Sequence, residues 1–148
     1  MTPCFEILRS CSASDFEDLA GLMRELNDTI VLTRESLDRL LADAASRLYV
    51  VRDEDGRIVG CACLCVYHQP FSTDASVESV VVSSRMRGRG LGQALLEHLL
   101  EEAAKLGVDC VHLTSNPARI AANALYRKLG FMRKDTNRYV YYFANVAK

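Results

Sequence analysis

The chain has 148 residues, the usual length of one compact domain, and we expect a single domain over residues 1–148. Its formal net charge is −1 and charged residues make up 25% of it, so no global basic field indicates a nucleic-acid partner. Residues 1–11 hold no apolar run typical of a signal peptide and no stretch approaches a membrane span, which favours a cytoplasmic protein with no membrane partner.

The first half of the chain alternates between strand and helix periodicity. A short strand is expected over residues 5–8, and Ser14 and Glu17 have the spacing of a capping box for the helix that follows. Thr33 can cap a second helix. Three strands come next, the first two joined as a hairpin, over residues 48–52, 58–67 and 75–82.

The second half starts with a glycine-rich, basic segment over residues 85–92, which opens a third long helix. The mixture of strands and helices predicts an α/β or α+β fold. The remaining elements are expected in the order strand, helix, strand, strand, over residues 108–114, 118–129, 132–134 and 138–143.

The segment from Arg85 to Gly92 combines three glycines with three arginines at a helix start. Glycines let the backbone approach an anion closely, and the first helical turn offers unpaired N–H groups in a favourable dipole field. No acidic residue occurs between Glu78 and Glu97, so the local charge is strongly positive. A pyrophosphate suits this arrangement, and a tight turn with solvated arginines is the structural alternative.

Two common classes of phosphate-binding site are disfavoured, because the segment lacks their sequence motifs. It has no Gly-Lys-Ser or Gly-Lys-Thr, which disfavours a nucleoside-triphosphate P-loop. Its glycine spacing does not match the dinucleotide fingerprint, and it follows a hairpin rather than the first βα turn.

Two motifs of the chain resemble those of the GCN5-related N-acetyltransferase (GNAT) family. The cofactor motif of that family is Arg or Gln, two residues, Gly, one residue, then Gly or Ala, and Arg87, Gly90 and Gly92 match it. Residues 123–131 resemble the second motif, in which an aromatic residue and a Gly-Phe pair close a helix. The order of the elements resembles the family from end to end.

The resemblance implies a fold and an activity. The fold is a mixed, mostly antiparallel central sheet of six to seven strands, flanked by about four helices and splayed at an acetyl-CoA cleft. The activity is an N-acetyltransferase that moves an acetyl group from acetyl-CoA to a primary amine of a small molecule or peptide by direct attack. Dimers are common in the family, which leaves a homodimer open.

The resemblance also implies where the cosubstrate binds. Backbone amides from Arg87 to Gln93 would cradle the pyrophosphate, and the backbone of residues 80–82 would pair with the pantetheine arm as an extra strand does. On the last long helix, Asn123 would contact pantetheine or a water beside it. The cofactor-binding residues so implied are Val80, Val81, Val82, Arg87, Gly88, Arg89, Gly90, Leu91, Gly92, Gln93, Arg119 and Asn123.

Tyr126 is the candidate general acid. Arg119, Asn123 and Tyr126 form a polar stripe on a helix, and a plain solvent-facing stripe would explain Arg119 but not Tyr126. In the family, the matching tyrosine protonates the departing thiolate of CoA. A thiolate whose conjugate acid has a pKa near 8.5 needs only a weak acid, and a tyrosine with a pKa near 10 can serve.

Glu78 is the candidate base, because it stands in an otherwise apolar strand just before the glycine-rich segment. Direct deprotonation of an ammonium is steeply uphill for an ordinary glutamate, so Glu78 would need a raised pKa or a chain of waters. Two alternatives stay open: Glu78 only orients the ammonium, or it is a structural partner of one of the arginines.

Six cysteines raise the question of metal or disulfides. Cys61, Cys63 and Cys65 alternate along one expected strand, so neighbours on that face are about 6.6–7 Å apart, which is awkward for a disulfide. No zinc-ligand spacing is present, and we expect no metal and small buried thiols. No Cys–His pair stands at a motif position, which disfavours the cysteine acyl-enzyme that is the main chemical alternative.

The acceptor amine stays unidentified at this level. In the family, acceptor selectivity resides in the first two helices and the strand loops, here roughly residues 25–34 and 68–74. A non-catalytic, acyl-CoA-binding regulatory module is the alternative to an enzyme, and Glu78 and Tyr126 argue weakly against it.

Overall fold

The computed structural model describes residues 2–144 of the chain. Internal contacts divide the chain into two compact units, Met1–Thr114 and Ser115–Lys148, and each is described by itself. Within the described range, no helix is both long enough and apolar enough to cross a membrane.

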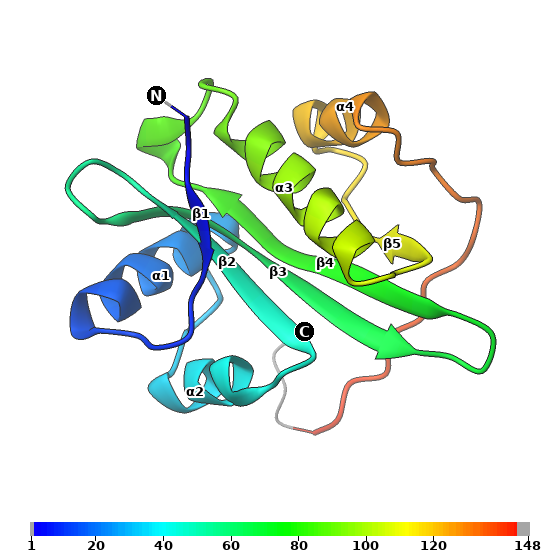
Figure 1. Ribbon diagram of the computed structural model, residues 1–148, viewed down its shortest axis with the longest axis horizontal. Helices are drawn as coiled ribbons and strands as arrows, with labels where there is room; N and C mark the ends of the chain where they lie inside the picture. Colours follow the sequence, from blue (N-terminus) through cyan, green and yellow to red (C-terminus); the bar gives the residue numbers. More distant parts are fainter. Residues whose placement is uncertain (1, 145–148) are drawn as a thin grey trace. The chain divides into compact units, whose positions relative to one another are not determined.

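A five-stranded mixed sheet forms the centre of the first unit (Figure 1). The first four strands pair antiparallel with their neighbours, and the fifth joins the fourth in parallel. The order of strands in the sheet equals their order along the chain. The strands are β1 Phe5–Ile7, β2 Ser46–Arg52, β3 Ile58–His68, β4 Thr73–Val82 and β5 Cys110–His112.

The sheet is mixed and mostly antiparallel, as predicted, but it has five strands rather than six to seven. The two final strands expected at 132–134 and 138–143 do not form, and both segments lie within the described residues. Aromatic side chains there are exposed, Tyr139 by 88% and Tyr141 by 83%. Aromatic and β-branched residues form a strand only where a neighbouring strand pairs with their backbone.

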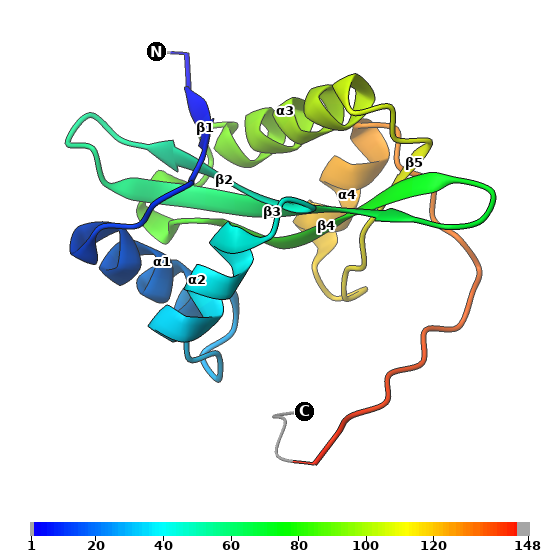
Figure 2. The ribbon, with the colours of Figure 1, turned by 60° about the horizontal axis from the view of Figure 1, so that its bottom comes forward.

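Three helices cover the two faces of the sheet. Figure 2 shows α1 and α2 on one face and α3 on the other. The helices are α1 Ala13–Leu26, α2 Arg34–Ala42 and α3 Leu91–Lys105. An apolar core joins α1 and α2 to the sheet, and its buried members are Leu8, Leu19, Leu22, Leu37, Leu48, Val50, Ile58, Cys61, Cys63 and Val81.

The capping box of α1 differs from the predicted one. Ser12 Oγ accepts a hydrogen bond from the Asp15 amide at 3.0 Å, and the Asp15 carboxylate accepts from the Ser12 amide at 3.4 Å. The prediction of Ser14 and Glu17 is therefore wrong by two residues. The reason is tertiary, because Asp15 also binds Arg52 of β2, with an N–O distance of 2.7 Å.

A β-bulge interrupts β4. Beyond the pair formed by Cys63 and Glu78, the ladder with β3 shifts, so that Ser79 and Val80 together lie opposite Ala62. Ser79 has a φ of 55°, and it is the one non-glycine residue with positive φ in the described part of the chain. Since such a backbone conformation is strained for a residue with a Cβ, the bulge is a specific feature of this strand.

The second unit contains the helix α4, Ile120–Lys128. Its C-terminus is a Schellman motif: the amide of Gly130 donates to the Arg127 carbonyl and the amide of Phe131 donates to the Tyr126 carbonyl, both at 3.0 Å. Gly130 has the left-handed φ of 97° that this motif needs. The rings of Tyr126 and Phe131 meet edge to face at 6.0 Å, which supplies the hydrophobic contact typical of the motif.

Candidate functional site

The loop between β4 and α3 carries two of the three glycines, Gly88 and Gly90, and the third, Gly92, lies in the first turn of α3. A short 3-10 turn, Ser84–Met86, leaves β4, and Gly88 and Gly90 follow with φ of 76° and 75°. Both lie in the left-handed region that glycine adopts without strain. The first amide bound inside α3 is that of Ala94, which donates to the Gly90 carbonyl at 3.0 Å. The amide of Gly92 precedes it in the first turn, where helical N–H groups point out of the helix end.

The N-terminus of α3 differs from those of the two other helices of its unit. Thr33 caps α2 as predicted, with its hydroxyl accepting from the Ser36 amide at 3.1 Å, and Ser12 caps α1. In contrast, the N-cap of α3 is Gly90, so this helix has no side-chain cap, and its first turn holds no acidic residue. Backbone donors and the positive end of the helix dipole thus remain for an anion from outside the helix.

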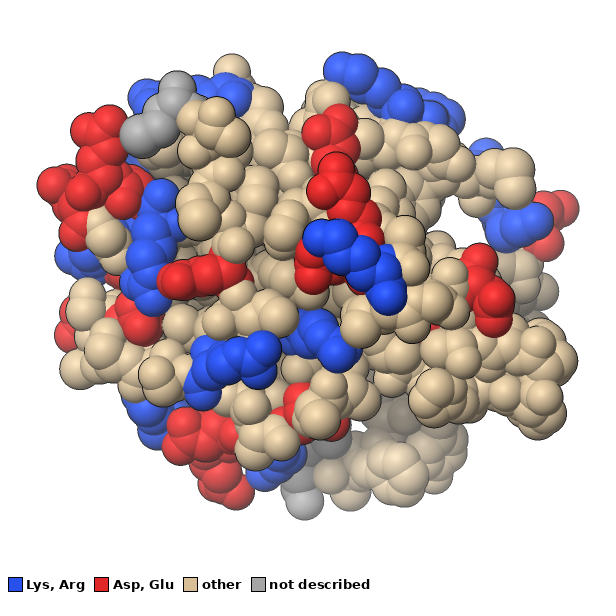
Figure 3. Space-filling model, viewed as in Figure 1, with Lys and Arg blue, Asp and Glu red and all other residues tan. Residues whose placement is uncertain are grey.

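Two of the three loop arginines have acidic partners inside the unit. Arg85 binds Asp53 at 2.8 Å, which holds the pKa of that carboxyl below its usual range, and Arg87 lies 3.7 Å from Glu25. Arg89 is exposed and has no ion pair among residues 2–144. On the face shown in Figure 3, basic and acidic side chains are interspersed. The charge of the loop is therefore more balanced than its sequence suggests.

Glu25 braces the start of the loop from α1. Its carboxylate accepts hydrogen bonds from both the amide and the hydroxyl of Ser84, each at 3.0 Å. Sequence reasoning missed Glu25 and Asp53 as supports of the loop, because each lies more than 30 positions from the group it binds.

The edge of β4 extends beyond its parallel ladder with β5. That ladder ends at the pair of Ser76 and His112, whereas β4 continues to Val82. At the end of this stretch, Arg87 Nε donates to the Val82 carbonyl at 3.1 Å. Residues 80–82, which we expected to pair with pantetheine, thus belong to the part of β4 that β5 does not cover, with one carbonyl bound by Arg87.

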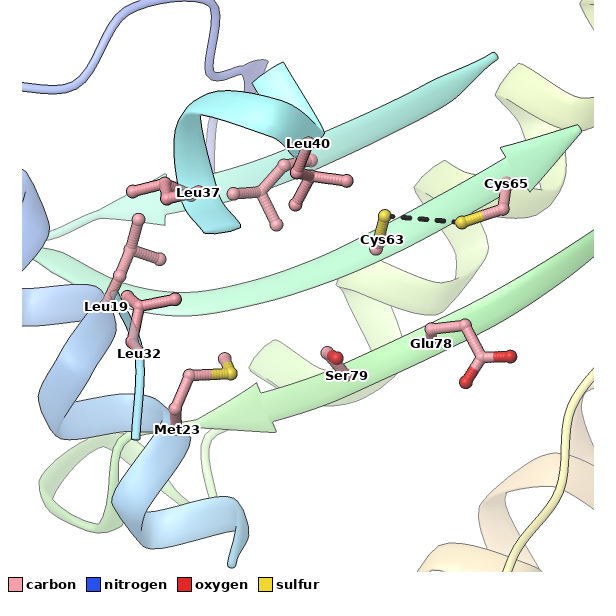
Figure 4. Close-up of a pocket in the computed structure, with 10 residues that line it drawn as sticks. Leu19, Met23, Leu32, Leu37, Leu40, Cys63, Cys65, Glu78 and Ser79 are labelled. Atoms are coloured by element: carbon pink, nitrogen blue, oxygen red, sulfur yellow. Dashed lines mark hydrogen bonds between the residues drawn. The ribbon is translucent and has the colours of Figure 1, made fainter. Parts of the chain in front are cut away.

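A cavity of about 250 Å³ lies between α1, α2 and the sheet (Figure 4). Its walls are mostly aliphatic, and Glu78 and Ser79 stand together on β4 beside the two thiols of β3. Of the segments expected to select the acceptor, only 25–34 contributes a lining residue, which is Leu32, and 68–74 contributes none. The lining residues are Leu19, Met23, Leu32, Leu37, Leu40, Leu48, Cys63, Cys65, Glu78 and Ser79.

Glu78 is exposed at this cavity and makes no ion pair within the described residues. Within the described residues, none of the three loop arginines forms an ion pair with Glu78: Arg85 binds Asp53, Arg87 lies near Glu25, and Arg89 has no ion pair. The structure therefore gives no support to the alternative in which Glu78 is a structural partner of one of the arginines.

The thiols beside Glu78 are closer together than the strand spacing suggests. Cys63 Sγ and Cys65 Sγ lie 3.6 Å apart, and all six cysteines are free. The hydrogen bond between them raises the pKa of Cys63 and lowers that of Cys65. Burial raises the pKa of Cys61 to about 12. The expectation of buried thiols is correct for Cys61 and Cys63 but wrong for Cys4 and Cys110, which are exposed, and Cys11 and Cys65 are half-buried.

The remaining predicted site residues lie in the second unit. Tyr126 is buried in α4, and Arg119 is the exposed N-cap of that helix. The Asn123 side-chain amide donates to the carbonyls of Asn116 at 2.9 Å and Arg119 at 2.8 Å. Asn123 therefore links α4 to the turn before it. Both hydrogen bonds use the side-chain nitrogen of Asn123, so the side-chain oxygen is the atom with which it could bind a ligand.

Comparison with known proteins adds an independent observation. The family model described as "Acetyltransferase (GNAT) family" matches residues 8–131, which run through both units. Among solved structures, a putative acetyltransferase from Agrobacterium tumefaciens str. C58 has the same fold, with a TM-score of 0.82 and 24% identity, covering 94% of this chain and 99% of that one.

Curated relatives match different lengths of the chain. The [Ribosomal protein bS18]-alanine N-acetyltransferase of Escherichia coli (strain K12) is 38% identical over 68 residues, so the aligned part spans about half of each protein, 46% of both. The probable glucosamine 6-phosphate N-acetyltransferase 2 of Oryza sativa subsp. japonica is 29% identical over 153 aligned positions, covering 95% of this chain and 90% of that protein.

Proposed function

Since the chain belongs to the acetyltransferase (GNAT) family, we propose that it transfers an acetyl group from acetyl-CoA to a primary amine of a small molecule or peptide. The observation that carries this proposal is the N-terminus of α3, where two left-handed glycines lead into a helix without a side-chain cap. Such an end fits the pyrophosphate of CoA.

The proposed binding residues follow from the loop and from β4. The amides that follow Arg87, as far as Gln93, hold the pyrophosphate, whereas the Arg87 amide donates to the Ser84 carbonyl at 3.5 Å; exposed Arg89 adds a positive charge. The edge of β4 at residues 80–82 holds the pantetheine arm, and the second unit contributes Arg119 and Asn123. When bound, acetyl-CoA supplies an acetyl thioester, whose carbonyl carbon is the electrophile.

Glu78 receives the acceptor in this proposal. Glu78 lines the apolar cavity just before the bulge and has no neutralising ion pair in the described chain, so it can attract an ammonium. Because a carboxylate is a far weaker base than an alkyl amine, Glu78 does not hold the proton; it orients the ammonium, whose proton leaves through water to the solvent, so that the small neutral fraction of the amine reacts. The aliphatic walls favour an acceptor with an apolar group next to its amine.

The neutral amine then attacks the thioester directly. Holding both reactants in one site removes much of the entropic cost of their encounter. Tyr126 donates a proton to the departing sulfur, because a phenol is acidic enough to protonate a thiolate.

A cysteine acyl-enzyme is the chemical competitor, since Cys65 lines the same cavity and its pKa is lowered. Within residues 2–144, however, neither Cys63 nor Cys65 contacts a histidine that could act as its base. Incubating the protein with acetyl-CoA alone separates the two routes. Direct attack predicts an unchanged protein mass, and a stoichiometric acetyl adduct on Cys65 would contradict it.

The proposal is tested by the initial rate of CoA-thiol release with acetyl-CoA and a panel of amines. The panel includes a peptide with N-terminal alanine and glucosamine 6-phosphate, the acceptors suggested by the names of two relatives. We expect at least one amine to raise the rate above that of acetyl-CoA alone. Saturable binding of acetyl-CoA without turnover of any amine would favour the regulatory module instead.

A further inference from the structure

Three side chains of metal-ligating type meet where β5 joins β4. The parallel register places Asp74 beside Cys110 and Ser76 beside His112, so that Asp74, Cys110 and His112 project from the same face of the sheet. Their ligand atoms all lie within 4.8 Å of one another. The cluster has no part in the proposed acetyl transfer.

The contacts within the cluster converge on one nitrogen. His112 Nε2 lies 3.2 Å from Cys110 Sγ and 3.1 Å from Asp74 Oδ2. A single ring nitrogen cannot at once accept from the thiol and donate to the carboxylate. Nor is this a catalytic triad, in which the two nitrogens of the imidazole bind different partners.

The carboxylate of the cluster is buried and incompletely paired. The Asp74 side chain is only 4% exposed, and its Oδ2 also accepts from Gln69 Nε2 at 2.7 Å. Its Oδ1 is buried without a hydrogen bond, and so is the hydroxyl of the neighbouring Ser72. Burying a carboxylate costs free energy, and a cation bound beside it at Oδ2 would offset part of that cost.

The distances fit a tetrahedral zinc ion. Bonds of about 2.3 Å to sulfur and about 2.0–2.2 Å to nitrogen and oxygen place neighbouring ligand atoms roughly 3.3–3.6 Å apart. The observed separations of 3.1 and 3.2 Å are slightly shorter, so small side-chain movements would admit the ion. Thiolate and imidazole ligands favour zinc over magnesium or calcium. Cys110 and His112 are exposed, which provides a path of entry.

We propose that Asp74, Cys110 and His112 form a binding site for Zn²⁺ that links β5 to β4. The three ligands leave the fourth position of a tetrahedron to water. The ladder between these strands has only three residue pairs, so the ion adds a cross-link to a short ladder. The site was not foreseen because Cys110 and His112 alone make no ligand set, and Asp74 joins them from another strand, 36 positions before Cys110.

The test is titration of the full chain with Co²⁺ in place of Zn²⁺, because cobalt bound to thiolate has a charge-transfer band. We expect one equivalent of Co²⁺ to bind with that band and one equivalent of Zn²⁺ to displace it. Cys110→Ser abolishes the band, and His112→Ala and Asp74→Asn weaken Zn²⁺ binding at least tenfold. Cys4→Ser, which removes another exposed cysteine, and Cys65→Ser leave both properties unchanged.

Thermal unfolding shows whether a variant that fails to bind metal is still folded. In the presence of a chelator, the parent and Cys110→Ser proteins should unfold at similar temperatures, whereas Zn²⁺ raises the transition of the parent alone. The proposal is overturned if the parent binds no stoichiometric metal, if the band survives in Cys110→Ser, or if Cys65→Ser removes it.

Discussion

Glu78 combines features that rarely occur together in a strand. It is exposed beside an apolar cavity, next to the strained Ser79, and has no ion pair in the described chain. A carboxylate so placed is available to an incoming ammonium.

Replacing this carboxylate should therefore slow the reaction. For Glu78→Gln we expect kcat/KM for the amine to fall by roughly 10²-fold, because the ammonium loses the carboxylate that orients it, with the KM for acetyl-CoA nearly unchanged. Steady-state CoA release measures both constants. Glu54→Gln, at another exposed glutamate, is the control and should behave like the parent. Parent-like turnover by Glu78→Gln at every pH would remove Glu78 from the mechanism.

Tyr126 offers a matched substitution, because phenylalanine keeps the ring that contacts Phe131. Tyr126→Phe should fold like the parent and lower kcat by roughly 10²-fold through loss of the proton donor. Tyr139→Phe, at a side chain that is 88% exposed, should leave kcat unchanged. An unaltered rate across the pH range would show that Tyr126 only packs.

At the scale of elements, the start of α3 depends on the left-handed conformation of Gly90. Gly90→Ala should cost about 1–2 kcal/mol of stability and raise the KM for acetyl-CoA roughly tenfold, because the amides shift from the pyrophosphate. Gly56→Ala is the matched control: its φ is 80°, it lies in the β2–β3 turn, and no atom crowds either position. It should lose similar stability with an unchanged KM. Equal KM values for acetyl-CoA in the two variants would show that the loop does not bind the cosubstrate.

The start of α1 provides a prediction about pH. Hydrogen bonds from Arg52 lower the pKa of Asp15. A carboxyl with a depressed folded pKa stabilises the protein above its unfolded pKa, about 3.9, and this contribution is lost as the pH falls through the folded pKa.

Asp15→Asn should therefore lower the free energy of unfolding by about 1–2 kcal/mol at pH 7. The difference in the free energy of unfolding between this variant and the parent should narrow as the pH falls below about 4. Urea unfolding at several pH values measures this, with Asp28→Asn, at an exposed aspartate, as the control. A difference that stays constant down to acidic pH would contradict the ion-pair explanation.

Elements with strong local signals could be predicted from the sequence. The Thr33 cap, the β2–β3 hairpin and the glycine-initiated α3 all depend on residues close together in the chain. The α1 cap was misplaced because Asp15 is chosen by a distant arginine, and the bulge at Ser79 has no local signature. Likewise, the sequence indicated the motif residues of the site but not the supports that Glu25 and Asp53 provide from other elements.

At the scale of the whole molecule, the chain belongs to the GNAT family, as its two motifs predicted, and the family match runs over residues 8–131. The near-neutral charge gives no broad basic surface, which agrees with the local anion site proposed at the start of α3. The proposed function requires that acetyl-CoA binds and that its acetyl group passes to an amine, with Glu78 and Tyr126 in the roles proposed above.

The most direct test of that requirement is mass spectrometry of the acceptor panel after incubation with acetyl-CoA labelled in its acetyl group. The proposed function predicts that an amine gains the labelled acetyl group, and that Gly90→Ala needs more acetyl-CoA to give the same yield. Acetyl-CoA that binds the protein yet keeps its label with every amine would contradict it.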